Sequence, residues 1–138
     1  MNNKTNIIFN ILFILYLLLI LMNILSIYTT VVDIGFNKTL NYINPIYEIV
    51  IFILPVFLFL KRKIAIVISL FSELYWIITM PIFFFKKYGF YSIKVTFNFL
   101  LNGFYQSFFM TGISWLILII SFIGVILLLI EKHTKKNN

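Results

Sequence analysis

The sequence predicts an all-α integral membrane protein, and its composition is the first reason. Of the 138 residues, 62% are hydrophobic and 11% are charged, whereas soluble domains are about 45–50% apolar and about 25% charged. A soluble fold of this size could not bury that much apolar surface. The composition therefore excludes a soluble enzyme, a DNA-binding protein, a disulfide scaffold and a disordered regulator.

The second reason is the length of the apolar runs, because a helix needs about 20 mostly apolar residues to cross a bilayer. Four runs reach or approach this length. They predict a single polytopic membrane domain with no soluble domain. Its four transmembrane helices are expected at about residues 7–27, 45–60, 64–85 and 111–130.

The first two runs have features that identify them as retained spans. The run at 7–27 follows Lys4, as a signal-peptide core would, but it is longer than such a core of about 7–15 residues and no small-residue cleavage site follows it. The second run begins at Pro45 after the capping residue Asn44. Its roughly 16 residues extend about 24 Å, which is short for a hydrocarbon core of about 30 Å. Extension toward Asn41 or local thinning of the bilayer would complete this span.

The turn between the second and third spans is strongly cationic and sets the predicted orientation. Lys61, Arg62 and Lys63 join the two spans directly, which predicts a tight helical hairpin. With four spans and both ends inside, seven Lys and Arg residues lie on the inner side and four on the outer side. Cytoplasmic loops are enriched in Lys and Arg, so this distribution favours cytoplasmic termini.

Residues 92–109 precede the last span and allow two interpretations. The segment 95–110 is apolar but contains Asn, Gln, Ser and Gly. We expect an interfacial helix on the outer leaflet, because Phe and Tyr are enriched at membrane interfaces. As a fifth span the segment would have about 16–18 residues, at the low end of the required length. A fifth span would also place the C-terminal lysines opposite the Lys61–Lys63 turn.

Glu73 lies near the middle of the third span, where a charge costs about 2.5–3.5 kcal/mol on insertion scales. On a helix it shares one face with other polar and amphipathic residues, which must face protein or water. We interpret this face as an intramembrane polar site. Its members are Ser69, Ser72, Glu73, Trp76 and Thr79, with Asn23 of the first span as the expected partner of the carboxyl group.

Two roles for Glu73 remain open from the sequence. The carboxyl group could hydrogen-bond a neighbouring helix and fix packing, which is worth about 0.6–2 kcal/mol per contact. It could instead be a protonatable or cation-binding site used in transport. Glu48 occupies the first turn of the second span, where we expect a solvated acid favoured by the helix dipole.

The last span carries a seam of small residues at Ser114, Ser121 and Gly124. Such a seam lets another helix approach closely. The sequence leaves open whether that helix belongs to the same chain or to a second copy.

The remaining composition bears on cofactors and on the host. There is no Cys and one His, so we expect no disulfide, no metal site and no cofactor. Catalytic motifs are missing, and we expect no enzymatic activity. The abundance of Ile, Phe, Asn and Lys is typical of AT-rich codons and favours the inner membrane of an AT-rich bacterium. The tail Lys135-Lys136-Asn137-Asn138 has the spacing of a dilysine retrieval signal, so the endoplasmic reticulum of a eukaryote is the alternative.

These observations lead to an ordered set of functional hypotheses. We expect a small non-enzymatic accessory, immunity or regulatory subunit. Its expected partners are the lipid bilayer and either further copies of itself or a larger membrane protein, and we expect no binding of nucleic acid. The first alternative is an oligomeric proton- or cation-coupled transporter of small molecules that uses Glu73. The second alternative is a holin-like pore former.

Overall fold

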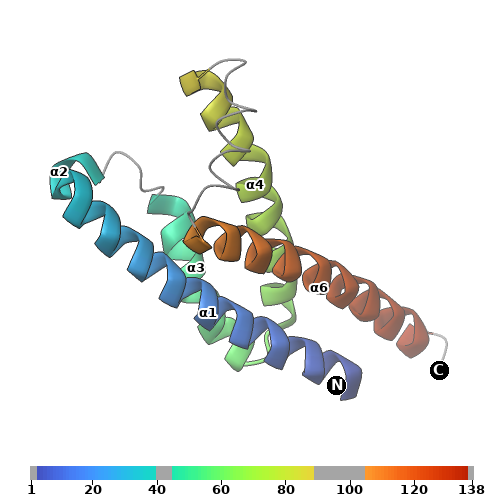
Figure 1. The fold of residues 1–138 in the computed structure, drawn as a ribbon. Coiled ribbons are helices and arrows are strands. Elements are labelled where there is room, and N and C mark those ends of the chain that lie inside the picture. The colour runs from blue at the N-terminus through green and yellow to red at the C-terminus, as the bar shows by residue number, and fades with distance from the viewer. Residues whose placement is uncertain (1–2, 40–44, 89–104, 137–138) are drawn as a thin grey trace.

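The computed structural model describes residues 3–39, 45–88 and 105–136, and the prediction of an all-α fold is confirmed for them (Figure 1). Four long helices and one short helix make up this described part of the chain. The elements are α1 (Asn3–Ile34), the single-turn α2 (Phe36–Thr39), α3 (Pro45–Phe59), α4 (Lys63–Tyr88) and α6 (Tyr105–Lys136).

The helix bounds agree closely with the expected spans for α3 and α4, whereas α1 and α6 are longer at both ends than predicted. Counting apolar residues detects only the stretch that could lie in hydrocarbon, but the helical backbone continues through polar residues. Of the predicted interfacial helix at 92–109, residues 92–104 lie outside the described part of the chain. Residues 105–109 are helical, as predicted, but they are continuous with α6 and do not belong to a separate helix.

Two left-handed residues end helices. Gly35 has φ of 85°, and its N–H donates to the carbonyl of Val31 at 2.9 Å, which closes α1. At the end of α3, Lys61 has φ of 52°, which is uncommon for a residue other than glycine. The N–H of Arg62 donates to the carbonyl of Phe57 at 3.0 Å, the 6→1 bond of a Schellman motif. The cationic turn is therefore a defined helix cap as well as a cluster of charge.

The four long helices form a ring in which each packs against two others. α1 and α6 lie side by side with the N- and C-termini at the same end, and the hairpin of α3 and α4 crosses them (Figure 1). α3 packs against α1, α4 packs against α6, and α3 packs against α4. Side chains that point to the middle of this ring meet residues from every helix.

Glu131 ties three helices together at the end that holds both termini. Its carboxylate accepts a hydrogen bond from the hydroxyl of Thr5 on α1 at 2.5 Å. It also forms an ion pair with Lys63 at the start of α4, with an N–O distance of 3.4 Å. The beginning of α1, the cationic turn and the end of α6 consequently lie together.

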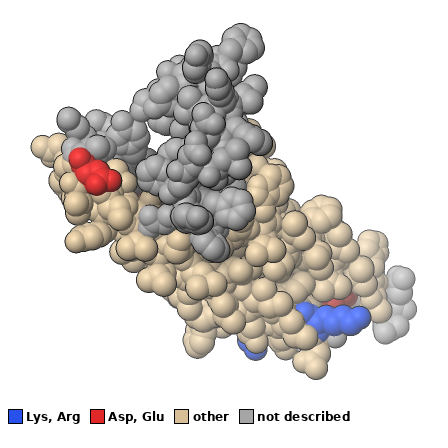
Figure 2. Space-filling model, in the orientation of Figure 1, with Lys and Arg blue, Asp and Glu red and all other residues tan. Residues whose placement is uncertain are grey.

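The outer surface of the bundle is apolar between its two ends. On the face drawn in Figure 2, the described charged side chains lie at the ends and an uncharged surface separates them. Large hydrophobic side chains are exposed on every long helix, among them Leu21, Phe59, Phe71 and Phe122. Two of the described helices are long and apolar enough to cross a membrane, over Asn3–Asp33 and Gly112–Thr134, and α3 has a shorter apolar stretch.

Candidate functional site

A polar cluster occupies the middle of the bundle, with Glu73 of α4 at its centre. The Glu73 side chain is completely buried. One carboxyl oxygen accepts a hydrogen bond from the Tyr16 hydroxyl of α1 at 3.1 Å, and the other accepts one from the Tyr47 hydroxyl of α3 at 3.4 Å. Three helices are therefore connected through a single carboxyl group.

Serines on α4 and α6 complete this arrangement. The Tyr16 hydroxyl also lies 3.3 Å from the Ser72 hydroxyl, which donates to the carbonyl of Ser69 at 3.1 Å. Ser114 of α6 lies close enough to interact with Glu73 and Tyr47. We call the set of six residues the Tyr–Glu–Ser cluster: Tyr16, Tyr47, Ser69, Ser72, Glu73 and Ser114.

The helical repeat explains how these residues meet. Ser72 and Glu73 follow Ser69 by three and four positions along α4, so the three residues lie on one face of the helix. This face points into the ring of helices. A buried polar group must find hydrogen-bond partners, because leaving one unsatisfied costs about 1–3 kcal/mol. Hydroxyl groups on the neighbouring helices supply those partners for Glu73.

Two hydroxyls in the cluster have hydrogen-bonding capacity that the described residues do not use. The side-chain oxygens of Ser69 and Ser114 are fully buried, and within the described part of the chain neither has a hydrogen-bond partner of standard geometry. Ser69 lies beside Tyr16, and Ser114 lies beside Glu73.

Asn23 and Thr79 do not join the cluster. The sequence predicts that Asn23 meets Glu73, but its amide donates instead to the carboxylate of Glu48 on α3, because it lies two turns farther along α1 than Tyr16. Glu48 is accordingly half-buried and paired rather than fully solvated. The Thr79 hydroxyl donates to the carbonyl of Tyr75 in its own helix at 2.8 Å.

Trp76 contributes to the cluster through packing. Its ring stacks on that of Tyr47, with centroids 6.0 Å apart and an interplanar angle of 24°. Offset stacking of this kind is favourable beyond the burial of apolar area. Trp76 therefore fixes the orientation of Tyr47, which donates to Glu73.

The small-residue seam of α6 faces other helices of the same chain. Ser114 and Ser121 are buried. A Cβ atom on Gly124 would lie 2.7 Å from a methyl group of Ile66 on α4 and 3.1 Å from one of Ile8 on α1. Three helices of the described chain therefore approach closely at Gly124.

Sequence reasoning missed Tyr47 and Glu131 as members of polar contacts. Tyr47 is next to Glu48 in the first turn of α3, and nothing in the local pattern separates it from the other tyrosines of the chain. Glu131 follows a long apolar run, so it resembles the ordinary polar end of a span. Its partners, Thr5 and Lys63, are distant in sequence.

The chemistry available to the cluster is hydrogen bonding and proton exchange. Among the described residues, no group of three or more His, Asp or Glu side chains could hold a metal ion. The hydrogen-bonded path runs from Ser72 through Tyr16 to Glu73, and on to Tyr47.

Comparisons of the chain with protein-family models, with curated proteins and with solved structures give no match.

Proposed function

We propose that the chain is a four-span membrane protein that acts as a non-enzymatic accessory, immunity or regulatory subunit. The observation that carries this proposal is the position of the Tyr–Glu–Ser cluster, which draws hydroxyl and carboxyl groups from all four long helices into one buried centre. Such a cluster serves to hold helices in register, as interhelical hydrogen bonds do in membrane bundles.

The surface of the bundle supports a membrane location and indicates how a partner would be met. Large apolar side chains project from every long helix, and the described charged side chains gather at the ends (Figure 2). Lys4, the Lys61–Lys63 turn and Lys132 lie at one end, which is the cytoplasmic end if the positive-inside rule holds. A partner subunit, or a second copy, would then contact helix faces within the bilayer.

The cell membrane proposed for this chain is the inner membrane of an AT-rich bacterium, with both termini cytoplasmic. The support is compositional: a bias toward Ile, Phe, Asn and Lys together with seven Lys and Arg residues on the proposed inner side. The endoplasmic reticulum remains the alternative, on the basis of the dilysine tail.

A coupled transporter is the second candidate, and one observation favours it. A groove of about 420 Å³ lies between α3 and α4, and its lining includes Tyr47 and Ser72. Tyr47 donates to Glu73, and Ser72 contacts Tyr16. A cation or proton that entered the groove would therefore meet Tyr47, which contacts the buried carboxyl group directly, and Ser72, which is connected to it through Tyr16.

Flux through proteoliposomes separates these candidates. The purified chain is reconstituted with a trapped pH-sensitive dye, and proton movement is followed under imposed pH, sodium and potassium gradients. The accessory role predicts the rate of protein-free liposomes for wild type, Glu73→Gln and the control Thr79→Val alike. Flux that Glu73→Gln abolishes and Thr79→Val preserves would establish the transporter. Loss of membrane potential when the chain is expressed in cells would instead indicate the holin-like pore former.

A further inference from the structure

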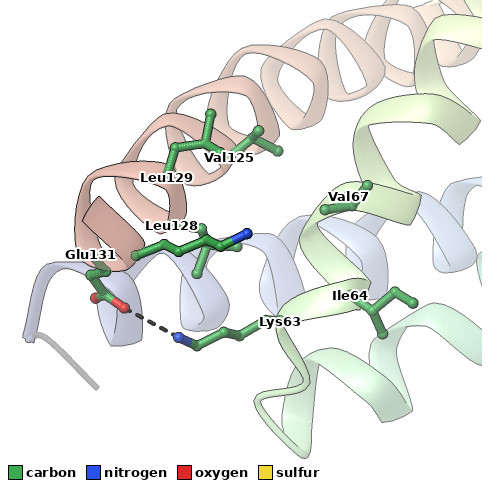
Figure 3. Close-up of a pocket in the computed structure, with 8 residues that line it drawn as sticks. Lys63, Ile64, Val67, Val125, Leu128, Leu129 and Glu131 are labelled. Atoms are coloured by element: carbon green, nitrogen blue, oxygen red, sulfur yellow. Dashed lines mark hydrogen bonds and ion pairs between the residues drawn. The ribbon is translucent and has the colours of Figure 1, made fainter. Parts of the chain in front are cut away.

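A second groove lies at the cationic end of the bundle, between the start of α4 and the end of α6. Its volume is about 420 Å³. Figure 3 shows Ile64 and Val67 of α4 on one side and side chains of α6 on the other. The full lining is Lys63, Ile64, Val67, Val125, Leu128, Leu129, Glu131 and Lys132. The groove therefore has apolar walls with charged residues at one end.

The charges at this groove are predominantly positive. Lys63 and Lys132 both line it, and Glu131 is the acidic residue among the lining. The Glu131 carboxylate is turned inward, with a side chain 14% exposed, and it accepts from Thr5 as well as from Lys63. The Lys63 side chain is 53% exposed. An ammonium group has three N–H donors, and the bond to Glu131 uses one of them.

We propose that this groove binds one anionic phospholipid, with an acyl chain against the apolar walls and the headgroup phosphate between Lys63 and Lys132. The inference rests on the proposed membrane location. Charge complementarity carries it: described cations at this end of the bundle include Lys4, the Lys61–Lys63 turn and Lys132, whereas Glu131 is paired internally. Basic pockets between helices at a cytoplasmic membrane surface are suited to anionic headgroups.

The groove also matches the shape of a phospholipid. Its apolar part, formed by Val67, Val125 and Leu128, continues from the lysines toward the middle of the bundle. A soluble phosphate would use the lysines and leave these walls exposed. A phospholipid would satisfy both parts, because its headgroup and chain are joined at the depth where the lysines lie.

Native mass spectrometry of the full chain in detergent tests the proposal. The probe is dioleoyl phosphatidylglycerol, compared with dioleoyl phosphatidylcholine and with inorganic phosphate. We expect one phosphatidylglycerol to bind preferentially. The double variant Lys63→Gln with Lys132→Gln should weaken the affinity for phosphatidylglycerol about fivefold for each lysine removed. The control Lys61→Gln with Arg62→Gln removes two cations at the same end that do not line the groove, and it should retain binding within about twofold.

A second pair of variants tests the apolar walls and does not disturb the ion pair. Val125→Trp fills the groove and should abolish the preferential adduct, whereas Ile126→Trp, at an exposed position of α6 outside the lining, should retain it. Equal binding of phosphatidylcholine, binding of inorganic phosphate alone, equal losses in the two charge variants, or retention in Val125→Trp would each overturn the proposal. Release of the chain from membranes by alkaline carbonate would instead refute the membrane location itself.

Discussion

Replacement of Glu73 by leucine tests whether the Tyr–Glu–Ser cluster holds the bundle together. Leucine offers no acceptor, so the hydroxyls of Tyr16 and Tyr47 lose the carboxyl oxygens that lie at 3.1 and 3.4 Å. Interhelical hydrogen bonds in membrane bundles are worth about 0.6–2 kcal/mol each. The longer bond belongs at the low end of this range, and Tyr16 keeps Ser72 as a neighbour at 3.3 Å. We therefore expect the free energy of unfolding to fall by about 2 kcal/mol.

The free energy of unfolding can be measured by titrating the protein in dodecyl maltoside micelles with sodium dodecyl sulfate and following far-ultraviolet circular dichroism. Glu73→Gln keeps one acceptor oxygen and the side-chain shape, so we expect a loss of about 1 kcal/mol. Thr79→Val is the matched control on α4. The Thr79 hydroxyl donates to carbonyls of its own helix, and this change should stay within about 0.5 kcal/mol of wild type.

Well-packed apolar residues can replace buried polar or ionised groups with no loss of stability, or with a gain. If Glu73→Leu were as stable as wild type or more stable, while Thr79→Val remained unchanged, the cluster would not stabilise the bundle. The retention of an acid at the centre of four helices would then require a functional explanation, and the transporter would become the better hypothesis.

Three further local features are tested by substitution, each with the same unfolding measurement. Gly124→Ala places a methyl group 2.7 Å from an Ile66 methyl and should lower the free energy of unfolding by about 1–3 kcal/mol. The control is Gly112→Ala, where no described atom lies within 4 Å, and its free energy of unfolding should be unchanged or rise by up to about 1 kcal/mol. Equal losses in the two variants would contradict the close approach. Gly35→Ala forces an L side chain to φ of 85° and should cost about 1–2 kcal/mol; an unchanged stability would show that the α1 cap does not require this conformation. Asn23→Leu removes the amide that donates to Glu48 and should cost about 1–2 kcal/mol, whereas a stabilised variant would show that this contact is not needed.

The sequence predicts the helices well because apolar runs and capping residues are local signals. Pro45 marks the first residue of α3 and the cationic turn separates α3 from α4, as expected. The excess length of α1 and α6 could not be read from apolar content, because their polar ends are helical without being apolar. Contacts between residues distant in sequence, such as the bonds of Glu131 to Thr5 and Lys63, lie at one end of these helices and are not encoded in any local pattern.

The candidate site could be predicted only in part for a related reason. The polar face of α4 follows from its own helical spacing, so the sequence alone is enough to group Glu73 with Ser69 and Ser72. Which residues of other helices reach that face depends on how far each helix is shifted along its axis. A shift of two turns along α1 separates Asn23, which pairs with Glu48, from Tyr16, which pairs with Glu73, and hydrophobicity does not encode such a shift.

We propose that four helices cross a membrane with both termini and the cationic turn on the same side. Because the chain contains no cysteine, single cysteines placed at Asn3, Asn37, Arg62 and His133 can each be labelled with a membrane-impermeant maleimide in intact spheroplasts. We expect labelling at Asn37 from outside, and labelling at Asn3, Arg62 and His133 only after the membrane is permeabilised. Labelling of His133 and Asn37 from the same side, or labelling of all four positions in a soluble fraction, would contradict this proposal.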